Sequence, residues 1–408
     1  MEASAMFNIY HSDTARQYEN YSARAQEQIA VIREYEQRGG AAPFYRINET
    51  STRTYNVDGL TSGYQDPLAY GYASVGGYTS CPENDQLAFL DSIGYREEYN
   101  SFNIVNTAFL PADALLGVRY ELSGYALPGL VEVEEIKERN HKSVYYNPYA
   151  LPAAVLFPRE EAAGNDADAA GTAVGRSDAD APFMTLEEMY SALYGAPAEL
   201  FVPVKAQETS ADGRTTWTLN APEGNYALYG NIPWEEPFEG KLSAREGERY
   251  GYGVWLSPSV FWIEERGDGQ AAVTLEARGR APISDPRFYA LSLDRLGEVT
   301  QSIRRQSAGA EVLTWDGRRI HVKVQTDSPC SLLLSAAASP GWEILVNGQR
   351  AEAGKFGKCL LCLPLEEGTW DVVLQYRTPG LVPGAALTAL GILLCALWAV
   401  RERRCKGS

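Results

Sequence analysis

The chain has 408 residues, enough for two or three domains, and a formal net charge of −17. Such an acidic surface repels nucleic acid and anionic lipid, so the composition excludes both as general binding partners. The 25 Tyr and 8 Trp are amphipathic aromatic residues that stack on sugars and also build β-sandwich cores, and the composition leaves both roles open.

Residues 1–40 predict an amphipathic helix. Apolar residues recur at spacings of three and four and a glycine pair ends the pattern, namely Tyr18, Tyr21, Ala25, Ile29, Ile32, Tyr35 and Gly39-Gly40. Residues 1–10 have neither the basic end nor the apolar core of a signal peptide. We therefore expect the chain to be the C-terminal part of a longer polytopic protein, or half of a split one.

Residues 41–158 predict a compact mixed α+β segment. The patterns indicate strands at 44–48 and 115–122 and a short helix at 86–93, while prolines exclude a helix at 147–152. Residues 159–182 are almost all Ala, Gly, Asp, Asn, Ser and Thr. They predict a flexible low-complexity insertion, because they offer too little apolar area to order themselves.

Residues 183–377 predict an antiparallel β-sandwich. After a helical pattern at 185–194, short strands recur between Gly, Asp and Pro residues, at 215–219, 226–229, 252–256, 271–275, 320–325, 331–335 and 372–376. The fold class is therefore mainly β, with an α+β N-terminal part.

The last hairpin is the most specific signal in that region. Asn347-Gly348 is a strong type I′ turn after the alternating strand 342–346. The alternation places Trp342 on the same face as Ile344 and Val346. We therefore predict that Trp342 is a core residue and not a platform for sugar.

Residues 378–400 predict a transmembrane helix. This stretch of 23 residues contains no charge and is followed by the basic tail 401–408, and a bilayer needs roughly 20 apolar residues in a helix. A buried core helix is the alternative, but the basic stop favours a span. Because basic residues stay in the cytoplasm, we expect a cytoplasmic tail and an extracytoplasmic body in a bacterial cell membrane.

Cysteines and histidines give no complete metal site. Cys359 and Cys362 have the spacing of half a zinc site but lie in a strand-like apolar run, so we interpret them as core residues. A disulfide from this pair to Cys330 stays open. The three histidines, His11, His141 and His321, are scattered without a motif, and the sequence indicates no metal and no cofactor.

Two groups of residues are candidates for binding. A segment rich in tyrosine could contact a glycan, through Tyr64, Tyr70, Tyr72 and Tyr78. Arg46, between strand aromatics, could hold a phosphate or form a structural ion pair with a carboxylate. The carboxylates around them are expected at the solvated surface, namely Glu49, Asp58, Asp66, Glu83 and Asp85. No catalytic residue is identified.

Several short motifs, in order along the chain, resemble the bacterial YfhO-like membrane proteins. They are Phe44-Tyr-Arg46, Tyr78-Thr-Ser80, Leu116-Gly-Val-Arg-Tyr120, Asn147-Pro-Tyr-Ala-Leu-Pro152, Gly341-Trp342, Val346-Asn-Gly348, Leu363-Pro-Leu365 and Tyr376-Arg-Thr-Pro-Gly380 before an apolar helix. This family is similar to polytopic glycosyltransferases that take a sugar from a polyprenyl-phosphate carrier outside the membrane. In Gram-positive members the resemblance implies decoration of teichoic acid.

The resemblance gives no catalytic residue to this chain, because the family's acidic catalytic residues lie in loops between N-terminal membrane helices. We expect an accessory ectodomain with its last transmembrane helix, which positions a cell-wall glycopolymer over a site made by a helical half encoded elsewhere in the same protein or in a split partner. A standalone membrane-anchored glycan-binding module is the alternative. A purely structural ectodomain is a third.

Overall fold

The structure is a computed structural model. It describes residues 2–40, 42–50, 54–56, 59–62, 65–78, 83–98, 103–105, 109–159, 179–233, 239–245, 250–253, 260–266, 269–277, 283 and 285–406. The insertion expected at 159–182 lies almost wholly outside the described residues, which resume at Ala179.

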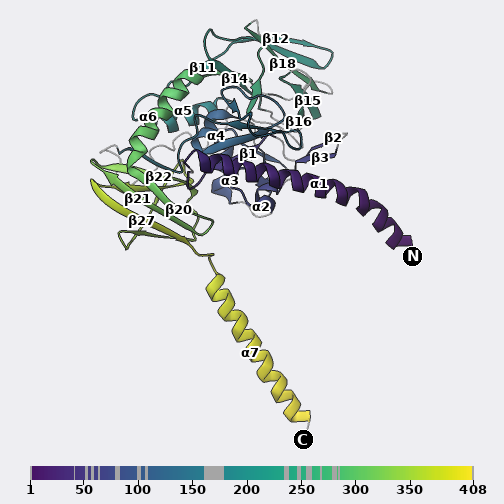
Figure 1. The fold of residues 1–408 in the computed structure, drawn as a ribbon, viewed down its shortest axis with the longest axis vertical. Coiled ribbons are helices and arrows are strands. Elements are labelled where there is room, and N and C mark those ends of the chain that lie inside the picture. The colour runs from purple at the N-terminus through teal and green to yellow at the C-terminus, as the bar shows by residue number, and fades with distance from the viewer. Residues whose placement is uncertain are drawn as a thin grey trace.

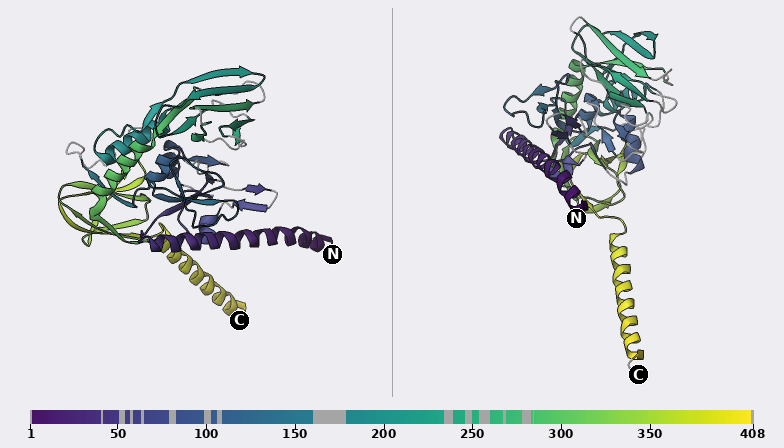
Figure 2. Two further views of the ribbon diagram at one scale, coloured as in Figure 1. Left: turned by 45° about the horizontal axis from the view of Figure 1, so that its top comes forward. Right: turned by 90° about the vertical axis from the view of Figure 1, so that its right-hand side faces the viewer.

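Two β-sandwiches lie on either side of a layer of helices (Figure 1). A smaller sheet packs against the long N-terminal helix, and a single C-terminal helix projects away from the body (Figure 2). The fold is thus mainly antiparallel β, with an α+β N-terminal part and one apolar C-terminal helix, which confirms the expected fold class.

The N-terminal sheet has the order β1-β7-β9-β8, with bounds Arg46–Glu49, Val118–Ser123, Ser143–Tyr146 and Val131–Glu132. Helix α1, Glu2–Arg38, covers one face with Ile29 and Ile32, which pack on Ile47, Tyr120 and Leu122. Strands β1 and β7 are parallel. Successive side chains of a strand point to opposite faces, so Asn48 and Glu121, which are paired across β1 and β7, make the other face polar.

Short elements connect this sheet to the helical layer. They are β2 Thr54–Asn56, β3 Gly59–Ser62, α2 Asp66–Tyr70, β4 Gly77–Tyr78, α3 Asn84–Ser92, β5 Arg96–Glu98, β6 Asn103–Val105 and α4 Leu110–Leu115. The strand expected at 115–122 begins only at Val118, because Leu115 ends α4 and Gly117 turns the chain with a φ of 70°.

The first sandwich spans Phe201 to Ser292. One sheet has the order β11-β19-β14-β17, with bounds Phe201–Pro203, Arg287–Ser292, Tyr226–Asn231 and Val260–Ile263. The other has the order β12-β13-β18-β15-β16, with bounds Ala206–Ala211, Arg214–Asn220, Gln270–Ala277, Glu239–Ser243 and Tyr250–Gly253. Trp217, Leu219 and Val273 are buried between the sheets.

The second sandwich is built from the C-terminal strands and one earlier strand. Its inner sheet has the order β10-β22-β26-β25, with bounds Ala154–Pro158, Cys330–Ala337, Leu360–Leu365 and Gly354–Phe356. Its outer sheet has the order β20-β21-β27-β23-β24, with bounds Ala310–Trp315, Arg319–Thr326, Gly368–Tyr376, Trp342–Val346 and Gln349–Ala351. Strand β10 precedes the first sandwich in the sequence, yet it pairs with β22, which follows that sandwich.

Helices α5, Ala181–Tyr194, and α6, Leu293–Gln306, fill the space between the sandwiches together with α3 and α4, and a short 3-10 turn follows α6 at Ser307–Gly309. The sheets facing this layer are buried on both sides: Leu228 enters the first sandwich core, while Ala227 and Tyr229 enter the helical core. This explains why their strands are apolar at consecutive positions.

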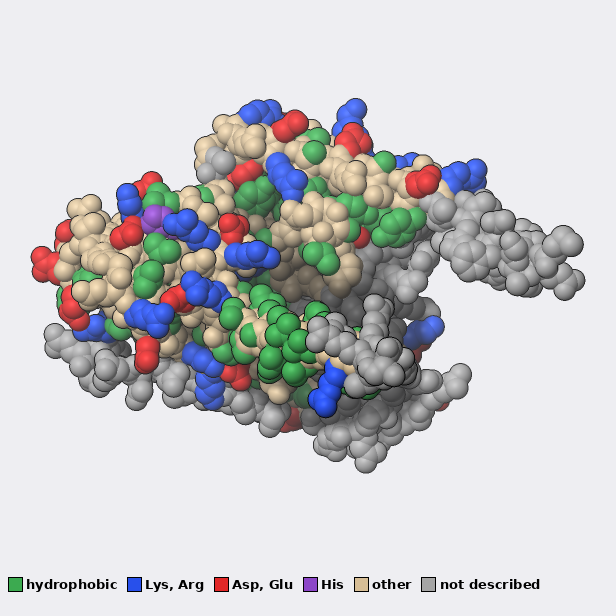
Figure 3. Space-filling model, turned by 90° about the horizontal axis from the view of Figure 1, so that it is seen from below, with side chains coloured by type: hydrophobic (Ala, Val, Ile, Leu, Met, Phe, Trp, Pro, Cys, Tyr) green, Lys and Arg blue, Asp and Glu red, His purple; other side chains and the backbone are tan. Residues whose placement is uncertain are grey.

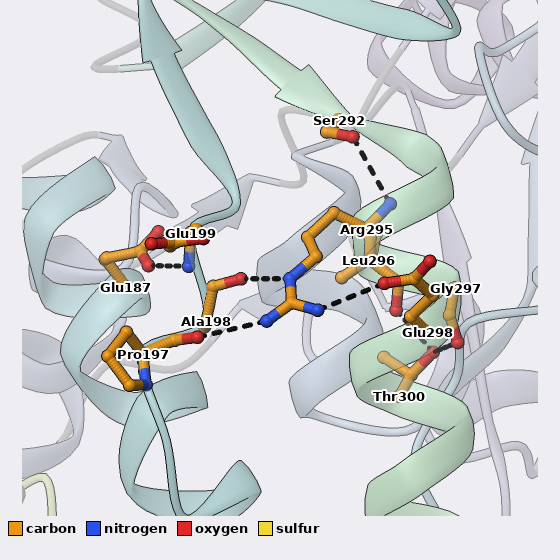
Figure 4. A network of polar contacts seen from close by, with 10 residues as sticks. All are labelled: Glu187, Pro197, Ala198, Glu199, Ser292, Arg295, Leu296, Gly297, Glu298 and Thr300. Carbon is orange, nitrogen blue, oxygen red and sulfur yellow. Dashed lines mark hydrogen bonds and ion pairs between the residues drawn. The ribbon is translucent and has the colours of Figure 1, made fainter.

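Arg295 of α6 fixes the loop that follows α5 (Figure 4). Its Nε donates to the carbonyl of Ala198 at 2.7 Å, its Nη2 to that of Pro197 at 3.1 Å, and its Nη1 pairs with Glu298 at 3.0 Å. Glu187 of α5 accepts from the backbone N–H of Leu200 at 2.9 Å. The chain is therefore held between both helices as it enters β11.

The segment 183–377 contains two sandwiches where the sequence suggested one. The strands expected at 215–219, 226–229, 271–275, 320–325, 331–335 and 372–376 are present, and α5 covers the helix expected at 185–194. The strand expected at 252–256 overlaps β16 at Tyr252 and Gly253 and otherwise lies outside the described residues. Helix α6 was not expected, and it divides the segment. Its apolar residues Leu293, Leu296, Val299 and Ile303 are buried at helical spacing behind the N-cap Ser292, so the signal was present in the sequence.

The last hairpin has the geometry that its Asn-Gly pair predicts. Asn347 and Gly348 have φ values of 49° and 77°, as a type I′ turn requires. Ile344 is buried opposite Leu374, and the half-buried Trp342 and Val346 pack on the same core. The ring of Trp342 meets that of Tyr376 at 5.2 Å and its Nε1 donates to the carbonyl of Ala337.

Cys330, Cys359 and Cys362 are free and buried. Cys330 faces the second sandwich core, whereas Cys359 and Cys362 face the helical core. Cys330 and Cys362 thus lie on opposite faces of one sheet, so the disulfide left open by the sequence is not formed. Burial raises the pKa of Cys359 and of Cys362 to about 12, as expected for inert core thiols.

Helix α7, Leu381–Lys406, is the one described helix long and apolar enough to cross a membrane, over Leu381–Ala399. No part of that window is buried against the rest of the protein. Four residues, 377–380, join it to the end of β27.

Candidate functional site

The N-terminal sheet carries the most densely polar interior that the described residues form, and Arg46 stands at its edge. At the start of β1, its guanidinium donates to the carbonyl of Leu116, to Ser335 Oγ at 2.7 Å and to the Ser335 carbonyl at 2.6 Å. It also lies 4.9 Å from the ring centroid of Phe44. Arg46 therefore ties the N-terminal sheet to the second sandwich.

This arrangement differs from both uses expected of Arg46. Among the described residues no carboxylate pairs with it, and its donors point to carbonyl and hydroxyl oxygens instead. Burial lowers the pKa of the guanidinium to about 10, so it stays charged at neutral pH. Binding of a phosphate would require it to leave these partners.

A pair of buried carboxyl groups lies on the polar face of the same sheet. Asn48 of β1 stands opposite Glu121 of β7. Asp113, from α4, accepts a hydrogen bond from Tyr95 and a longer one, 3.4 Å, from the Asn48 amide, and it is hydrogen-bonded to Glu121. Asn48, Tyr95, Asp113 and Glu121 are each at most 2% exposed.

The protonation of this pair departs from that of carboxylates in water. Burial raises the pKa of Asp113 to about 7, although the hydrogen bonds from Tyr95, Glu121 and Asn48 offset part of the rise. Burial also raises the pKa of Tyr95 well above its ordinary value, and the nearby Asp113 adds to this. The pair can therefore hold a shared proton near neutral pH, but it is enclosed and presents no atom to a substrate.

This cluster was not predicted from the sequence. A usable signal was Asp113 itself, which stands in the apolar run Leu110-Pro-Ala-Asp-Ala-Leu-Leu116. A carboxyl group in such a run is costly unless it is protonated or paired. The partner Glu121 had no comparable signal, because only the fold brings it beside Asp113.

A second polar layer lies between the sheet and α1. Lys142 Nζ contacts Glu49 Oε2 at 2.7 Å, with 5% and 12% of the two side chains exposed, and Tyr72 donates to Glu49 Oε1 at 2.8 Å. Tyr21 of α1 donates to Asp66. Asp66 is therefore buried and Glu49 half-buried, which corrects their expected place at the solvated surface; Glu83 and Asp85 are exposed as expected.

The tyrosine-rich segment does not form an open platform where it is described. Tyr70 and Tyr72 are half-buried and pack against α1 and the sheet, with the Tyr70 ring 6.3 Å from that of Tyr21. Burial and the adjacent Glu49 raise the pKa of Tyr72. Tyr64 and the side chain of Tyr78 lie outside the described residues, as does Asp58. The structure thus brings Tyr70 and Tyr72 into one cluster, whereas the guanidinium of Arg46 contacts Leu116, Ser335 and Phe44.

Within the described part of the chain, no group of three or more His, Cys, Asp or Glu is placed to hold a metal ion. His321 instead pairs with Asp371 at 2.7 Å on the outer sheet of the second sandwich.

Two solved structures show a distant similarity to this chain. A conserved protein of unknown function from Pseudomonas aeruginosa PAO1 is 16% identical, with 42% of this chain and 82% of that chain covered and a TM-score of 0.14. The arabinofuranosyltransferase AftD from Mycobacteria is 10% identical, with 68% of this chain and 28% of that chain covered and a TM-score of 0.18. These scores support no assignment of fold or function.

A search of curated protein sequences finds no match. The family comparison is decisive, because residues 1–388 match the family described as "Bacterial membrane protein YfhO". This match covers the N-terminal sheet, both sandwiches and the start of the apolar helix α7. The chain therefore belongs to the YfhO family of bacterial membrane proteins.

Proposed function

We propose that this chain is the extracytoplasmic, acceptor-positioning part of a cell-envelope glycosyltransferase of the YfhO family. In this proposal a helical membrane half carries the transferase site and takes the sugar from a polyprenyl-phosphate carrier. The chain contributes a rigid two-sandwich body that holds the acceptor, a teichoic acid or a related glycopolymer, over that site.

The observation that carries the proposal is the short connection between the body and the apolar helix. Strand β27 ends at Tyr376 and α7 begins at Leu381. An extended chain advances about 3.5 Å per residue, so the second sandwich cannot move far from the membrane. A body held this close to the membrane suits a reaction in which the sugar donor is a lipid, because the sugar of such a donor lies at the membrane surface.

The residues proposed to touch the acceptor are those of the tyrosine-rich segment, of which Tyr70 and Tyr72 are described. Both are half-buried beside α1, so part of each side chain is accessible to a glycan. No catalytic role is assigned to the buried pair of Asp113 and Glu121, because both side chains are enclosed.

Reconstitution tests the proposal. Residues 1–408 in liposomes, given a polyprenyl-phosphate sugar and a teichoic acid acceptor, should show no transfer until the helical half of the family is supplied. The two halves together should then transfer sugar. The helical half alone should bind the acceptor more weakly than the two halves together. Turnover by this chain alone would contradict the accessory role. Acceptor binding with no effect on any transferase would favour the standalone glycan-binding module.

A further inference from the structure

The end of the second sandwich nearest to α7 gathers aromatic and basic side chains, here called the tether-end rim. It consists of Trp315, Arg318, Arg319, Trp342, Tyr376 and Arg377. The three aromatic residues are half-buried and the three arginines are exposed.

Strand direction brings these residues to one end of the outer sheet. Strand β21 begins at Arg319 opposite Gln375, β23 begins at Trp342 opposite Tyr376, and β20 ends at Trp315. Arg318 and Arg377 extend from these strand ends, where the backbone N–H of Tyr376 donates to the carbonyl of Arg318. All six residues therefore lie where β27 leaves the sandwich for α7.

The opposite end of the sandwich has the opposite charge. Its turns join β21 to β22 and β26 to β27, and they expose Asp327, Glu366 and Glu367. Glu366 also pairs with Arg159 at 2.7 Å. The far end thus exposes mainly carboxylates, whereas the tether end exposes three arginines beside Asp316 and Glu343.

The rim is held rigid before any partner binds. Asp316 Oδ1 accepts from the backbone N–H groups of Arg318 and Arg319, each at 2.7 Å, which fixes their loop. The ring of Trp315 stacks on that of Phe44 at 4.7 Å. The carboxylates near the arginines are already engaged, since Asp316 caps this loop and Glu343 contacts Arg350 at 2.7 Å and Arg377 at 3.4 Å.

The tether then limits how far the rim can stand from a bilayer that α7 crosses. Five steps from Tyr376 to Leu381 span at most about 17 Å, and the headgroup layer on one side of a bilayer is about 5–8 Å thick. The backbone N–H of Leu381 donates to the carbonyl of Thr378 at 3.2 Å, so the connection turns and is shorter than this limit. The rim is therefore the part of the sandwich that must lie closest to the headgroups.

We propose that the tether-end rim docks on the phosphate headgroups of the bilayer that α7 spans. Arginine binds phosphate through a planar fork of donors, and Trp and Tyr favour the membrane–water interface. Figure 3 views the body from the side of α7, where Lys and Arg side chains, interspersed with Asp and Glu, lie on the face of the body to the left of the apolar helix. The acidic remainder of the body is repelled by the same surface, which orients the sandwich upright. This proposal needs α7 to span but not the transferase role.

The test compares two positions on the full chain in vesicles of phosphatidylcholine and phosphatidylglycerol. Cys81, Cys395 and Cys405 are first replaced by Ser. An environment-sensitive fluorophore is then attached at Gly317→Cys on the rim, where an added side chain meets no atom within 4 Å, or at the far-end residue Ser328→Cys. Lipids with a spin label on the headgroup should quench the rim fluorophore and leave the far-end fluorophore unquenched.

Arginine substitutions separate docking from simple tethering. Charge reversal of Arg318, Arg319 and Arg377 to Glu should abolish most of the quenching at position 317, while reversal of the exposed Arg24, Arg266 and Arg305 should preserve it. A matching set of Gln variants serves if charge reversal disturbs folding, which circular dichroism checks. Full quenching in the rim variants would overturn the proposal, because the tether alone would explain it. An unquenched rim in the parent chain would overturn it as well.

Discussion

Asp113 keeps a carboxyl group out of water beside Glu121, and this makes stability depend on pH. The pKa of Asp113 is about 7 in the folded protein and 3.8 in its ordinary state, so the folded protein binds this proton more tightly than the unfolded chain does. The stability that this protonation contributes is complete below the unfolded pKa and is lost as pH rises through about 7. Asp113→Asn should therefore flatten the fall in unfolding free energy between pH 4 and 8, an effect of a few kcal/mol. Denaturant titrations across this range measure it.

Asp85 provides the control for that experiment. It is exposed, and its hydrogen bond and charge contact with Lys355 lower its pKa, so any contribution is present above the unfolded pKa and lost at more acidic pH. Asp85→Asn should leave the slope between pH 5 and 8 unchanged. An unaltered slope in Asp113→Asn would show that the buried pair does not exchange a proton in this range.

Arg46 is expected to act on stability through the acceptors it satisfies. Arg46→Met should lower the unfolding free energy by roughly 2–3 kcal/mol, because the carbonyl of Leu116 and the oxygens of Ser335 lose a charged donor. Arg350→Met, at a side chain 83% exposed, should change it by less than about 0.5 kcal/mol. An Arg46→Met chain of full stability that had lost affinity for phosphate polymers would instead support the phosphate-binding role.

At the scale of elements, the last hairpin can be tested at its turn. Gly348 has a φ of 77° and open space around an added side chain, so Gly348→Ala tests backbone strain alone. We expect a loss of about 1–2 kcal/mol in unfolding free energy. Gly317→Ala is the matched control: it is equally open but has no positive φ, and it should be neutral or slightly stabilising. Equal effects in thermal unfolding would argue against the type I′ turn.

Trp342 tests the same hairpin through its packing. A fully buried Trp→Ala substitution costs about 3–5 kcal/mol, and Trp342 is half-buried against Ile344 and Tyr376. Trp342→Ala should therefore cost roughly half of that range, while Trp342→Phe should retain most of the stability. A stable Trp342→Ala chain that lost only glycan binding would reverse its assignment as a packing residue.

At the scale of the whole molecule, the proposed membrane orientation rests on the basic tail after the apolar helix. Cys405 should react with a membrane-impermeant thiol reagent only after cells are permeabilised, because we expect residues 401–408 in the cytoplasm. Ser328→Cys, on the exposed far end of the second sandwich, should react in intact cells. Labelling of Cys405 without permeabilisation would place the tail outside and invert the proposed orientation.

The sequence alone was sufficient to predict those features that depend on residues within one continuous segment. An uncharged stretch of 23 residues before a basic tail indicates the apolar helix, and Asn347-Gly348 indicates the turn, because span length and positive φ depend on neighbouring residues alone. Helix α1 and most strands follow from their periodicity in the same way. Helix α6 was equally readable from Leu293, Leu296, Val299 and Ile303, but it was overlooked.

Only the tertiary structure decided which segments meet. Strand β10 pairs with β22, although the whole first sandwich lies between them in the sequence. Arg46 contacts Ser335 at a separation of 289 residues. Helix α6 divides the strands into two sandwiches. Glu121 looks like an ordinary acidic residue until α4 places Asp113 beside it on the polar face of the sheet. Periodicity states which face of an element is buried, but the partner of that face depends on how the apolar surfaces of distant segments fit together.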